Sequence, residues 1–258
     1  MIGIVYFFVI IIANSIGAVS GMGGGVIIKP IFDFIGADSV TSITFYSAIA
    51  VLTMSIVSTF RQFKSGIELE LKIIGWLSAG AVVGGIIGNA TFEYLLGLFV
   101  DEKDLQFLQI VLTVLTLLFA YFYSKFNWKN FSFKNYIIYL LCGLFLGFLA
   151  SLLGIGGGPI NVSFLMLLFA MPIKKATVYS IAIIFFSQLS KIVTIAIAVG
   201  FERYNLTMLF FIIPAAILGG LVGAKLSNLF SQKVVTVVFQ SVILLVLVIN
   251  IVNGFQLL

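Results

Sequence analysis

The longest uncharged stretch of the chain constrains its fold more than any other feature. It runs for 39 residues, from Asn135 to Ile173, without an aspartate, glutamate, lysine or arginine. A helix needs about 20 apolar residues to cross the hydrocarbon core of a bilayer. Of the 258 residues, 62% are hydrophobic and 9% are charged, whereas soluble domains are about 25% charged. The sequence therefore predicts an all-α polytopic protein of a cell membrane.

The residue types that are missing exclude several kinds of chemistry. The chain has no histidine, and Cys142 is its only cysteine. It therefore has no imidazole ligand, no thiolate cluster and no Ser-His or Cys-His catalytic pair. Neither a Gly-x-Ser-x-Gly elbow nor a P-loop is present. We expect no enzyme, no catalytic residue, no metal site and no cofactor.

Three short motifs recur in the same order in the two halves of the chain. They are Gly-x-Gly-Gly-Gly at 21–25 and 154–158, Thr-x-Tyr-Ser at 44–47 and 177–180, and Gly-Gly-x-x-Gly at 84–88 and 219–223. The first two pairs are 133 residues apart and the third pair is 135 apart. We interpret residues 1–124 and 136–258 as two transmembrane repeats, joined by the basic linker 125–135.

Each half divides into five apolar segments, the second of which is short. The segments cover about 3–20, 25–37, 39–60, 73–97 and 105–124, then 136–153, 159–173, 175–200, 205–224 and 234–254. If every segment crosses the membrane, an odd number of spans gives the two halves opposite orientations, which is an inverted repeat. The sequence predicts about ten transmembrane segments, with a Gly-rich break before each short one.

The lysines and arginines predict the orientation. With the linker in the cytoplasm, the ten-span arrangement leaves only Lys103 and Arg203 outside. It places ten basic residues inside: Arg61, Lys64, Lys72, Lys125, Lys129, Lys134, Lys174, Lys175, Lys225 and Lys233. If the short segments only enter the membrane and return to the same side, the count becomes seven basic residues inside and five outside. Since basic residues favour the cytoplasmic side, we expect both termini outside. No basic region precedes the first segment, so we expect it to remain as a span.

The linker also bears on the partners of the protein. It interleaves aromatic residues with lysines, and the formal net charge of the chain is +5. A segment of this kind is typical of the membrane interface on the cytoplasmic leaflet. The expected partners are the lipid bilayer and a small anionic substrate, with no nucleic acid.

The two Gly-x-Gly-Gly-Gly clusters predict where the substrate binds. Short, Gly-interrupted segments at matching places in inverted halves are typical of a transporter's binding site. Each cluster precedes a short helix, whose N-terminus offers free N–H groups and the positive end of a dipole. Two such ends meeting at mid-membrane would hold an anion. The candidate residues are Gly23, Gly24, Gly25, Gly156, Gly157 and Gly158.

Glycines also allow helices to cross closely, and this alternative stays open for the clusters. It is the favoured interpretation for the other glycines at matching or neighbouring positions: Gly84, Gly85, Gly88, Gly143, Gly147, Gly219, Gly220 and Gly223.

A Gly-x-Gly-Gly-Gly turn after a first apolar helix, repeated in the second half, resembles the sulfite exporter TauE/SafE family. The resemblance covers essentially the whole chain. It implies a membrane transporter for sulfur-containing anions, inorganic or organic. In the family a proline follows each cluster by a few residues, as Pro30 does here. The second half departs from this pattern, because Ser163 stands at the matching position and Pro159 directly follows the cluster.

A lysine inside the membrane is the next candidate. Lys191 shares one helical face with Ser180, Ser187 and Thr194, at spacings of 7, 4 and 3, and Gln188 lies beside this face. Ionisable groups within membrane segments are costly and are functional candidates. A cationic stripe lined by hydroxyls suits an oxyanion. The alternative is a lysine that snorkels to the interface.

Three further polar residues have two interpretations each. Lys29 binds substrate or pairs with Asp33, four residues along the short segment. Asn161 donates to substrate or caps the short helix after the second cluster. Ser47, which matches Ser180 in the repeat, faces the site or hydrogen-bonds another helix.

The function that fits these features is secondary transport of a small sulfur-containing anion such as sulfite or an organosulfonate. The anion would bind between the two Gly-rich broken helices, and the halves would rock around it. A passive anion channel is the alternative. An anion leaving a cell with a negative interior gains about 2.3 kcal/mol per charge per 100 mV, so voltage alone can drive export.

Overall fold

The computed structural model describes residues 2–62, 70–126 and 128–257, and within these ranges it contains helices and connections but no strand. The helices are α1 (Ile2–Ser20), α2 (Gly25–Ile35), α3 (Val40–Gln62), α4 (Leu71–Leu98), α5 (Glu102–Lys125), α6 (Tyr136–Leu153), α7 (Gly158–Phe169), α8 (Ile173–Ala198), the short 3-10 helix η1 (Leu206–Met208), α9 (Leu209–Leu229) and α10 (Gln232–Leu257). The prediction of an all-helical protein is confirmed, and an α-helix lies at each of the expected apolar segments.

Not all of the ten expected segments are long enough to cross a bilayer as single helices. Eight of the described helices are long and apolar enough to span a bilayer. The other two, α2 and α7, have 11 and 12 residues. At 1.5 Å per residue they are about 17 and 18 Å long, well short of the roughly 30 Å hydrocarbon core.

The backbone explains why these two helices stop early. Helix α2 ends at Gly36, whose φ of 63° is the left-handed conformation that closes many helices. Helix α7 ends at Ala170, which adopts a left-handed φ of 51°. The following Pro172 forms the N-cap of α8. Alanine rarely adopts a positive φ, so the residue type at 170 does not itself indicate this stop.

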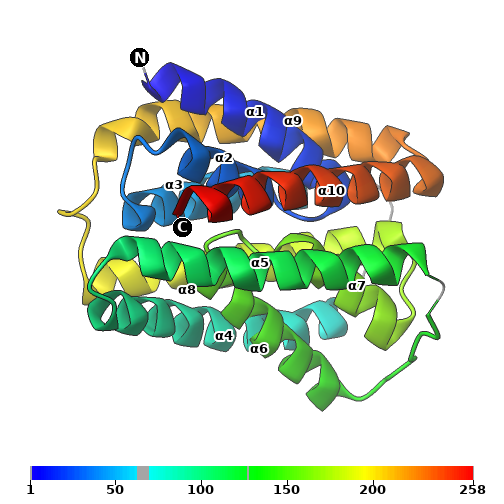
Figure 1. The fold of residues 1–258 in the computed structure, drawn as a ribbon. Helices are drawn as coiled ribbons and strands as arrows, with labels where there is room; N and C mark the ends of the chain where they lie inside the picture. The colour runs from blue at the N-terminus through cyan, green and yellow to red at the C-terminus, as the bar shows by residue number, and fades with distance from the viewer. Residues whose placement is uncertain (1, 63–69, 127, 258) are drawn as a thin grey trace.

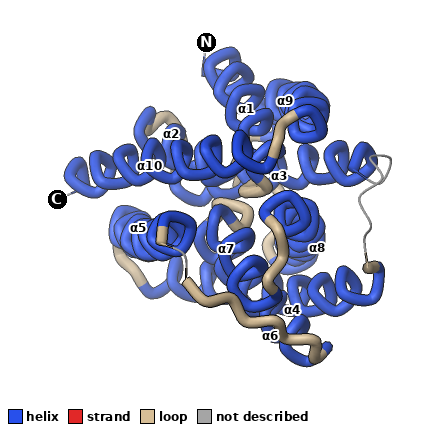
Figure 2. The backbone as a smooth tube through the Cα atoms, turned by 90° about the vertical axis from the view of Figure 1, so that its right-hand side faces the viewer, coloured by secondary structure: helices blue, strands red, loops and turns tan. Residues whose placement is uncertain are grey.

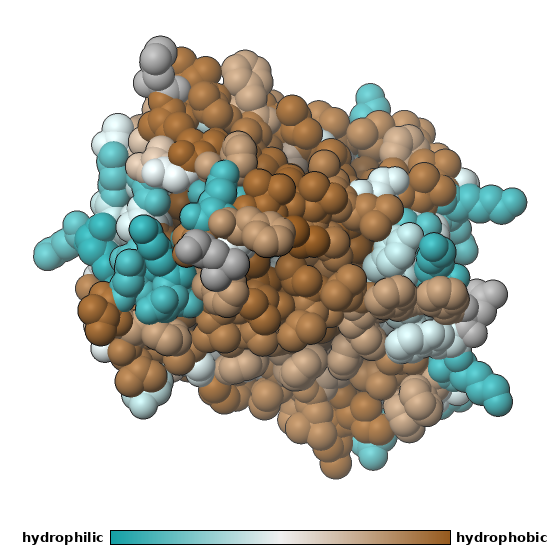
Figure 3. All heavy atoms as spheres, in the orientation of Figure 1, coloured by the Kyte–Doolittle hydropathy of each residue, from teal (hydrophilic) through white to brown (hydrophobic). Residues whose placement is uncertain are grey.

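The helices run side by side between two ends of the molecule, as Figure 1 shows. Helix α1 begins and α10 ends on the left, and the linker between α5 and α6 lies on the right. On the face shown in Figure 3, apolar residues cover the middle and hydrophilic residues gather at the two ends. This pattern suits a protein embedded in a bilayer. Lys64, which entered the charge count, lies outside the described residues.

The helices form two layers, which Figures 1 and 2 show from directions 90° apart. One layer holds α1, α2, α3, α9 and α10, and the other holds α4 to α8. In the first layer α9 packs against α1 and α3, and in the second α4 packs against α6 and α8. The layers therefore do not follow the two halves of the chain, because the last two helices of each half join the first three of the other.

Glycines lie at several of these helix contacts. A Cβ added at Gly84 or Gly80 of α4 would collide with backbone carbonyls of α6. One added at Gly223 of α9 would collide with the backbone of α1 at Ser15. These positions agree with the expected role of such glycines in close helix crossing.

Candidate functional site

The two glycine clusters meet in the interior, between the layers. Helix α1 ends at Ser20 just before the first cluster, and α6 ends at Leu153 just before the second. A Cβ added at Gly25 would lie 2.5 Å from the carbonyl oxygen of Ile155, and one at Gly23 would lie 3.7 Å from that of Gly156. Every residue of 21–25 and 154–158 is buried. Segments 133 residues apart thus form one buried centre.

Each cluster also contacts the other half of the chain in the same way. The contacts come in two pairs related by the 133-residue offset: Gly21 with Thr177 and Gly154 with Thr44, then Gly23 with Ile184 and Gly156 with Val51. Reciprocal contacts of this kind are what a two-fold relation between two similar units produces.

The backbone of the clusters presents N–H groups that have no partner. Glycine permits the positive φ values, which are 71° and 72° at Gly21 and Gly23 and 71° and 111° at Gly156 and Gly157. Neither short helix has a side-chain N-cap. Within the described ranges, the N–H groups of Gly23, Gly24, Gly156 and Gly157 donate to no acceptor. Buried N–H groups are rarely left unpaired, and turns that expose several of them bind anions.

An asparagine lies against each cluster. A Cβ added at Gly157 would meet the side chain of Asn161, and one added at Gly24 would meet that of Asn14. Neither oxygen nor nitrogen of the fully buried Asn161 amide has a hydrogen-bond partner in the described part of the chain. Asn14 donates from Nδ2 to the carbonyl of Ala50 at 3.2 Å, and its Oδ1 is unpaired. Sequence reasoning missed Asn14, although a lone amide in an uncharged apolar segment was a usable signal.

The equivalent serines differ in their hydrogen bonding. Ser180 donates to the carbonyl of Gly21 at 2.6 Å, which ties α8 to the first cluster. Ser47 is fully buried beside Gly25, and its hydroxyl has no partner among the described residues. Other unpaired buried polar atoms near the two breaks belong to Thr44, Ser151 and Ser163. Such a concentration of unpaired groups is unusual in a folded interior and suits a site that binds a polar ligand.

Lys191 does not snorkel to the membrane interface. Its side chain is 1% exposed, and Nζ donates to the carbonyl of Ser151 at 2.8 Å and lies 5.4 Å from the ring centre of Phe92. No carboxylate of a described residue lies within ion-pair distance of it. Together with Gln109, which donates to Leu152 at 2.8 Å, Lys191 holds the carbonyl end of α6 just before the second cluster. This is the end of a helix dipole that favours a cation.

Other polar residues of the expected stripe make contacts within α8 and with α4. Ser187 donates to the carbonyl of Ile184 at 3.1 Å, and its backbone lies against Gly85 of α4. The Gln188 amide nitrogen donates to the hydroxyl of Ser187 at 3.4 Å, and the Gln188 amide oxygen is unpaired in the described part of the protein.

Lys29 pairs with Asp33. The two charged atoms are 2.8 Å apart, and each side chain is 3% exposed. The carboxylate compensates the charge of Lys29, which is the structural alternative expected from the spacing.

Comparison with known proteins shows the family of the chain. The profile of the family described as sulfite exporter TauE/SafE matches residues 6–250. The chain belongs to the TauE/SafE family. It is similar to a probable membrane transporter protein of Methanocaldococcus jannaschii, with 26% identity over 90% of this chain and 89% of the relative. It is also similar to the probable membrane transporter protein YunE of Bacillus subtilis, with 24% identity over 92% of each. No solved structure matches.

Membership of the TauE/SafE family, together with eight candidate spans, makes this chain a multi-pass membrane transporter.

Proposed function

We propose that the protein is a secondary transporter that exports a small sulfur-containing anion, such as sulfite or an organosulfonate. The description of the family supports this substrate class. The substrate would bind at mid-membrane, where the two glycine clusters meet.

The burial of Lys191 without a carboxylate partner among the described residues is the observation that carries the proposal. A buried cation without a counter-ion is strongly disfavoured in a medium of low dielectric constant. An anion bound near the second cluster would supply the missing charge. The unpaired N–H groups of Gly156 and Gly157 lie at the same break, only a few residues after Ser151, the hydrogen-bond acceptor of Lys191.

In the proposed site each group has a separate role. The N–H groups of Gly23, Gly24, Gly25, Gly156, Gly157 and Gly158, where free, contact the oxygens of the anion. The amide of Asn161 and the hydroxyl of Ser47 donate hydrogen bonds that orient it. Lys191 supplies positive charge, while Ser180 positions the first cluster through Gly21.

We further propose that residues 1–124 and 136–258 are inverted repeats, with the linker 125–135 in the cytoplasm and both termini outside. The reciprocal glycine contacts and the placement of the linker opposite the chain ends support this proposal. Alternating access would then come from motion of the two layers against each other, because helices of both repeats contribute to each layer.

Flux through purified protein in liposomes tests the function. Uptake of sulfite, thiosulfate, sulfate, sulfonates and carboxylates is compared at fixed voltage. Flux that saturates with a sulfur anion and shows counterflow is expected of the transporter. Large unitary currents would instead identify a passive anion channel.

Lys191→Met tests the site within the same assay. It removes the charge and keeps a side chain of similar length, so we expect sulfur-anion flux to fall at least tenfold (about 1.4 kcal/mol) at equal protein abundance. The matched control is the double variant Lys29→Met/Asp33→Asn, which removes a buried charge that is already paired. The control should transport like the parent. Parental flux in Lys191→Met would refute the role given to this lysine.

A further inference from the structure

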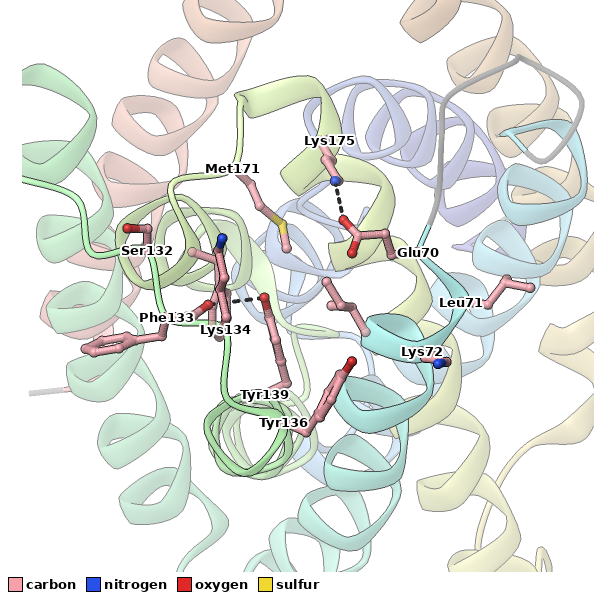
Figure 4. Close-up of a pocket in the computed structure, with 12 residues that line it drawn as sticks. Glu70, Leu71, Lys72, Ser132, Phe133, Lys134, Tyr136, Tyr139, Met171 and Lys175 are labelled. Carbon is pink, nitrogen blue, oxygen red and sulfur yellow. Dashed lines mark hydrogen bonds and ion pairs between the residues drawn. The ribbon is translucent and has the colours of Figure 1, made fainter.

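A second site lies at the linker end of the molecule, away from the glycine clusters. A cavity of about 790 Å³ opens between the linker and the ends of four helices, as Figure 4 shows. Its lining includes three lysines, Lys72, Lys134 and Lys175, and one carboxylate, that of Glu70. The cavity therefore has an excess of positive charge.

The ends of the helices around the cavity add to this positive potential. Helices α4, α6 and α8 begin at Leu71, Tyr136 and Ile173, and residues of the first turn of each line the cavity. The N-terminus of a helix carries a partial positive charge, which favours anions nearby. Lysines and helix ends of the same sign, facing a concave surface, concentrate anions from the solvent.

The deeper wall of the cavity is apolar. The rings of Tyr139 and Phe169 are stacked with their centres 4.2 Å apart, and both side chains are buried. Met171 and Ile73 complete this wall. The hydroxyl of Tyr139 donates to the carbonyl of Phe133 in the linker at 3.2 Å. A basic rim over an aromatic wall suits an anion that has an apolar body, such as an aromatic or alkyl sulfonate.

Glu70 occupies the position where such an anion would bind. Its Oε1 lies 3.0 Å from Nζ of Lys175, and Figure 4 shows the two side chains facing each other at the cavity. The backbone N–H of Glu70 donates to the hydroxyl of Tyr179 at 2.9 Å, which holds the start of α4 in place. A carboxylate fixed beside a lysine competes with any free anion for that lysine.

We propose that this cavity is an entry site for organic sulfonates, with the Glu70 carboxylate as an intramolecular competitor. The inference rests on the proposed transport function, because the cavity is an entry site only if the sulfonate is carried from the linker end to the opposite end. Binding of the sulfonate at the cavity is measured separately from transport. The ligand would place its sulfonate among the lysines and its apolar body against Tyr139 and Phe169.

The opposite end of the molecule provides the matched control. There Arg203 pairs with Glu93, with Nη1 and Oε2 3.1 Å apart. Tyr46, the repeat equivalent of Tyr179, donates to the carbonyl of Asn205 at 3.2 Å. Removing Glu93 therefore removes a similar surface ion pair without touching the cavity.

Trp76 reports on the cavity, because its ring stacks on that of Tyr136 with the centres 6.0 Å apart. The chain has two tryptophans, so Trp128→Phe leaves Trp76 as the single tryptophan, which is excited selectively over the tyrosines at long wavelength. Benzenesulfonate is titrated into the full-length Trp128→Phe protein in detergent, with neutral benzenesulfonamide as the comparison ligand. Glu70→Gln should lower the dissociation constant of benzenesulfonate about threefold, and Lys134→Met should raise it about threefold, since single exposed charges have modest effects. Glu93→Gln should leave it unchanged.

The inference fails if neither Glu70→Gln nor Lys134→Met changes the dissociation constant, or if benzenesulfonamide binds as tightly as benzenesulfonate. Repeating the titration in Lys191→Met separates this inference from the proposed function. Binding that persists there, with flux lost, supports both sites. Binding that persists while flux is also unchanged refutes only the central site.

Discussion

The two glycine clusters share a motif and a set of contacts, but their backbones differ. Gly24 lies in the right-handed helical region with φ of −71°, whereas its equivalent Gly157 has φ of 111°. Pro159 lies in the first turn of α7, while Pro30 lies in the middle of α2. Proline restricts the backbone of the residue before it and has no N–H. The turn formed by the second glycine cluster therefore differs in conformation from the turn formed by the first. The repeat thus preserves contacts between the halves rather than local conformation.

The asymmetry extends to the amides beside the clusters. Asn14, which lies against Gly24, is part of α1 and precedes its cluster. Asn161, which lies against Gly157, is part of α7 and follows its cluster. Asn14 is anchored to Ala50, and Asn161 has no hydrogen-bond partner in the described ranges. The second cluster therefore has the greater unused capacity to bind a ligand.

The largest difference is expected between Gly157→Ala and Gly24→Ala. Alanine at 157 is strained by the backbone itself, at a cost of about 2 kcal/mol, whereas alanine at 24 collides mainly with the side chain of Asn14. Thermal unfolding in detergent should show that adding Asn14→Ala recovers much of the loss in Gly24→Ala. Adding Asn161→Ala to Gly157→Ala should recover little. Equal recovery in the two double-mutant cycles would mean that the clusters are conformationally alike.

A smaller effect separates the two asparagines. Asn161→Leu removes two unpaired buried atoms, so the melting temperature should stay the same or rise while affinity for the sulfur anion falls about tenfold. Asn14→Leu removes a donor to the carbonyl of Ala50 and should destabilise the protein by about 1 kcal/mol. Melting curves with and without substrate measure both quantities. A drop in stability for Asn161→Leu would show that its amide has a structural partner.

The smallest effect distinguishes the serines. Ser180→Ala loses the hydrogen bond to Gly21 and should lower stability by about 1 kcal/mol. Ser47→Ala loses no hydrogen bond of the described structure, so stability should be unchanged and substrate affinity should fall by about threefold. The same melting and binding measurements apply. Identical stability losses would contradict the difference seen between these equivalent residues.

The sequence predicted the helices well because uncharged runs and glycines mark their positions directly. Helix α2 begins at Gly25 and α7 begins at Gly158, each at the end of a run of glycines. The sequence also placed Lys191 within a membrane segment that has no other charge between Lys175 and Glu202, but it left open whether the side chain snorkels to the interface.

The contacts between residues and between helices were harder to predict than the positions of the helices along the chain. Lys191 donates to a backbone carbonyl, and every residue has one. The residue type at 151 therefore could not identify Ser151 as the acceptor. Gly84 and Gly219 mark helix faces that pack closely, but they do not say which helix packs there. The sequence therefore could not predict that the two layers exchange helices between the halves of the chain. The cavity at Glu70 depends on where the linker and four helix ends meet, which is also a property of the tertiary fold.

The exchange of helices between layers has a consequence for biogenesis. The layer of α4 to α8 is continuous in sequence, so it can assemble as soon as α8 has left the translocon. The other layer is discontinuous, because α1 and α3 pack against α9, which is made last but one. Helices α1 to α3 must therefore wait in the bilayer with an incomplete interface until α9 and α10 are inserted. A nascent chain arrested after α8 would hold one finished layer and three helices that still lack their contacts with α9 and α10, which makes the arrival of α9 the step that completes the second layer.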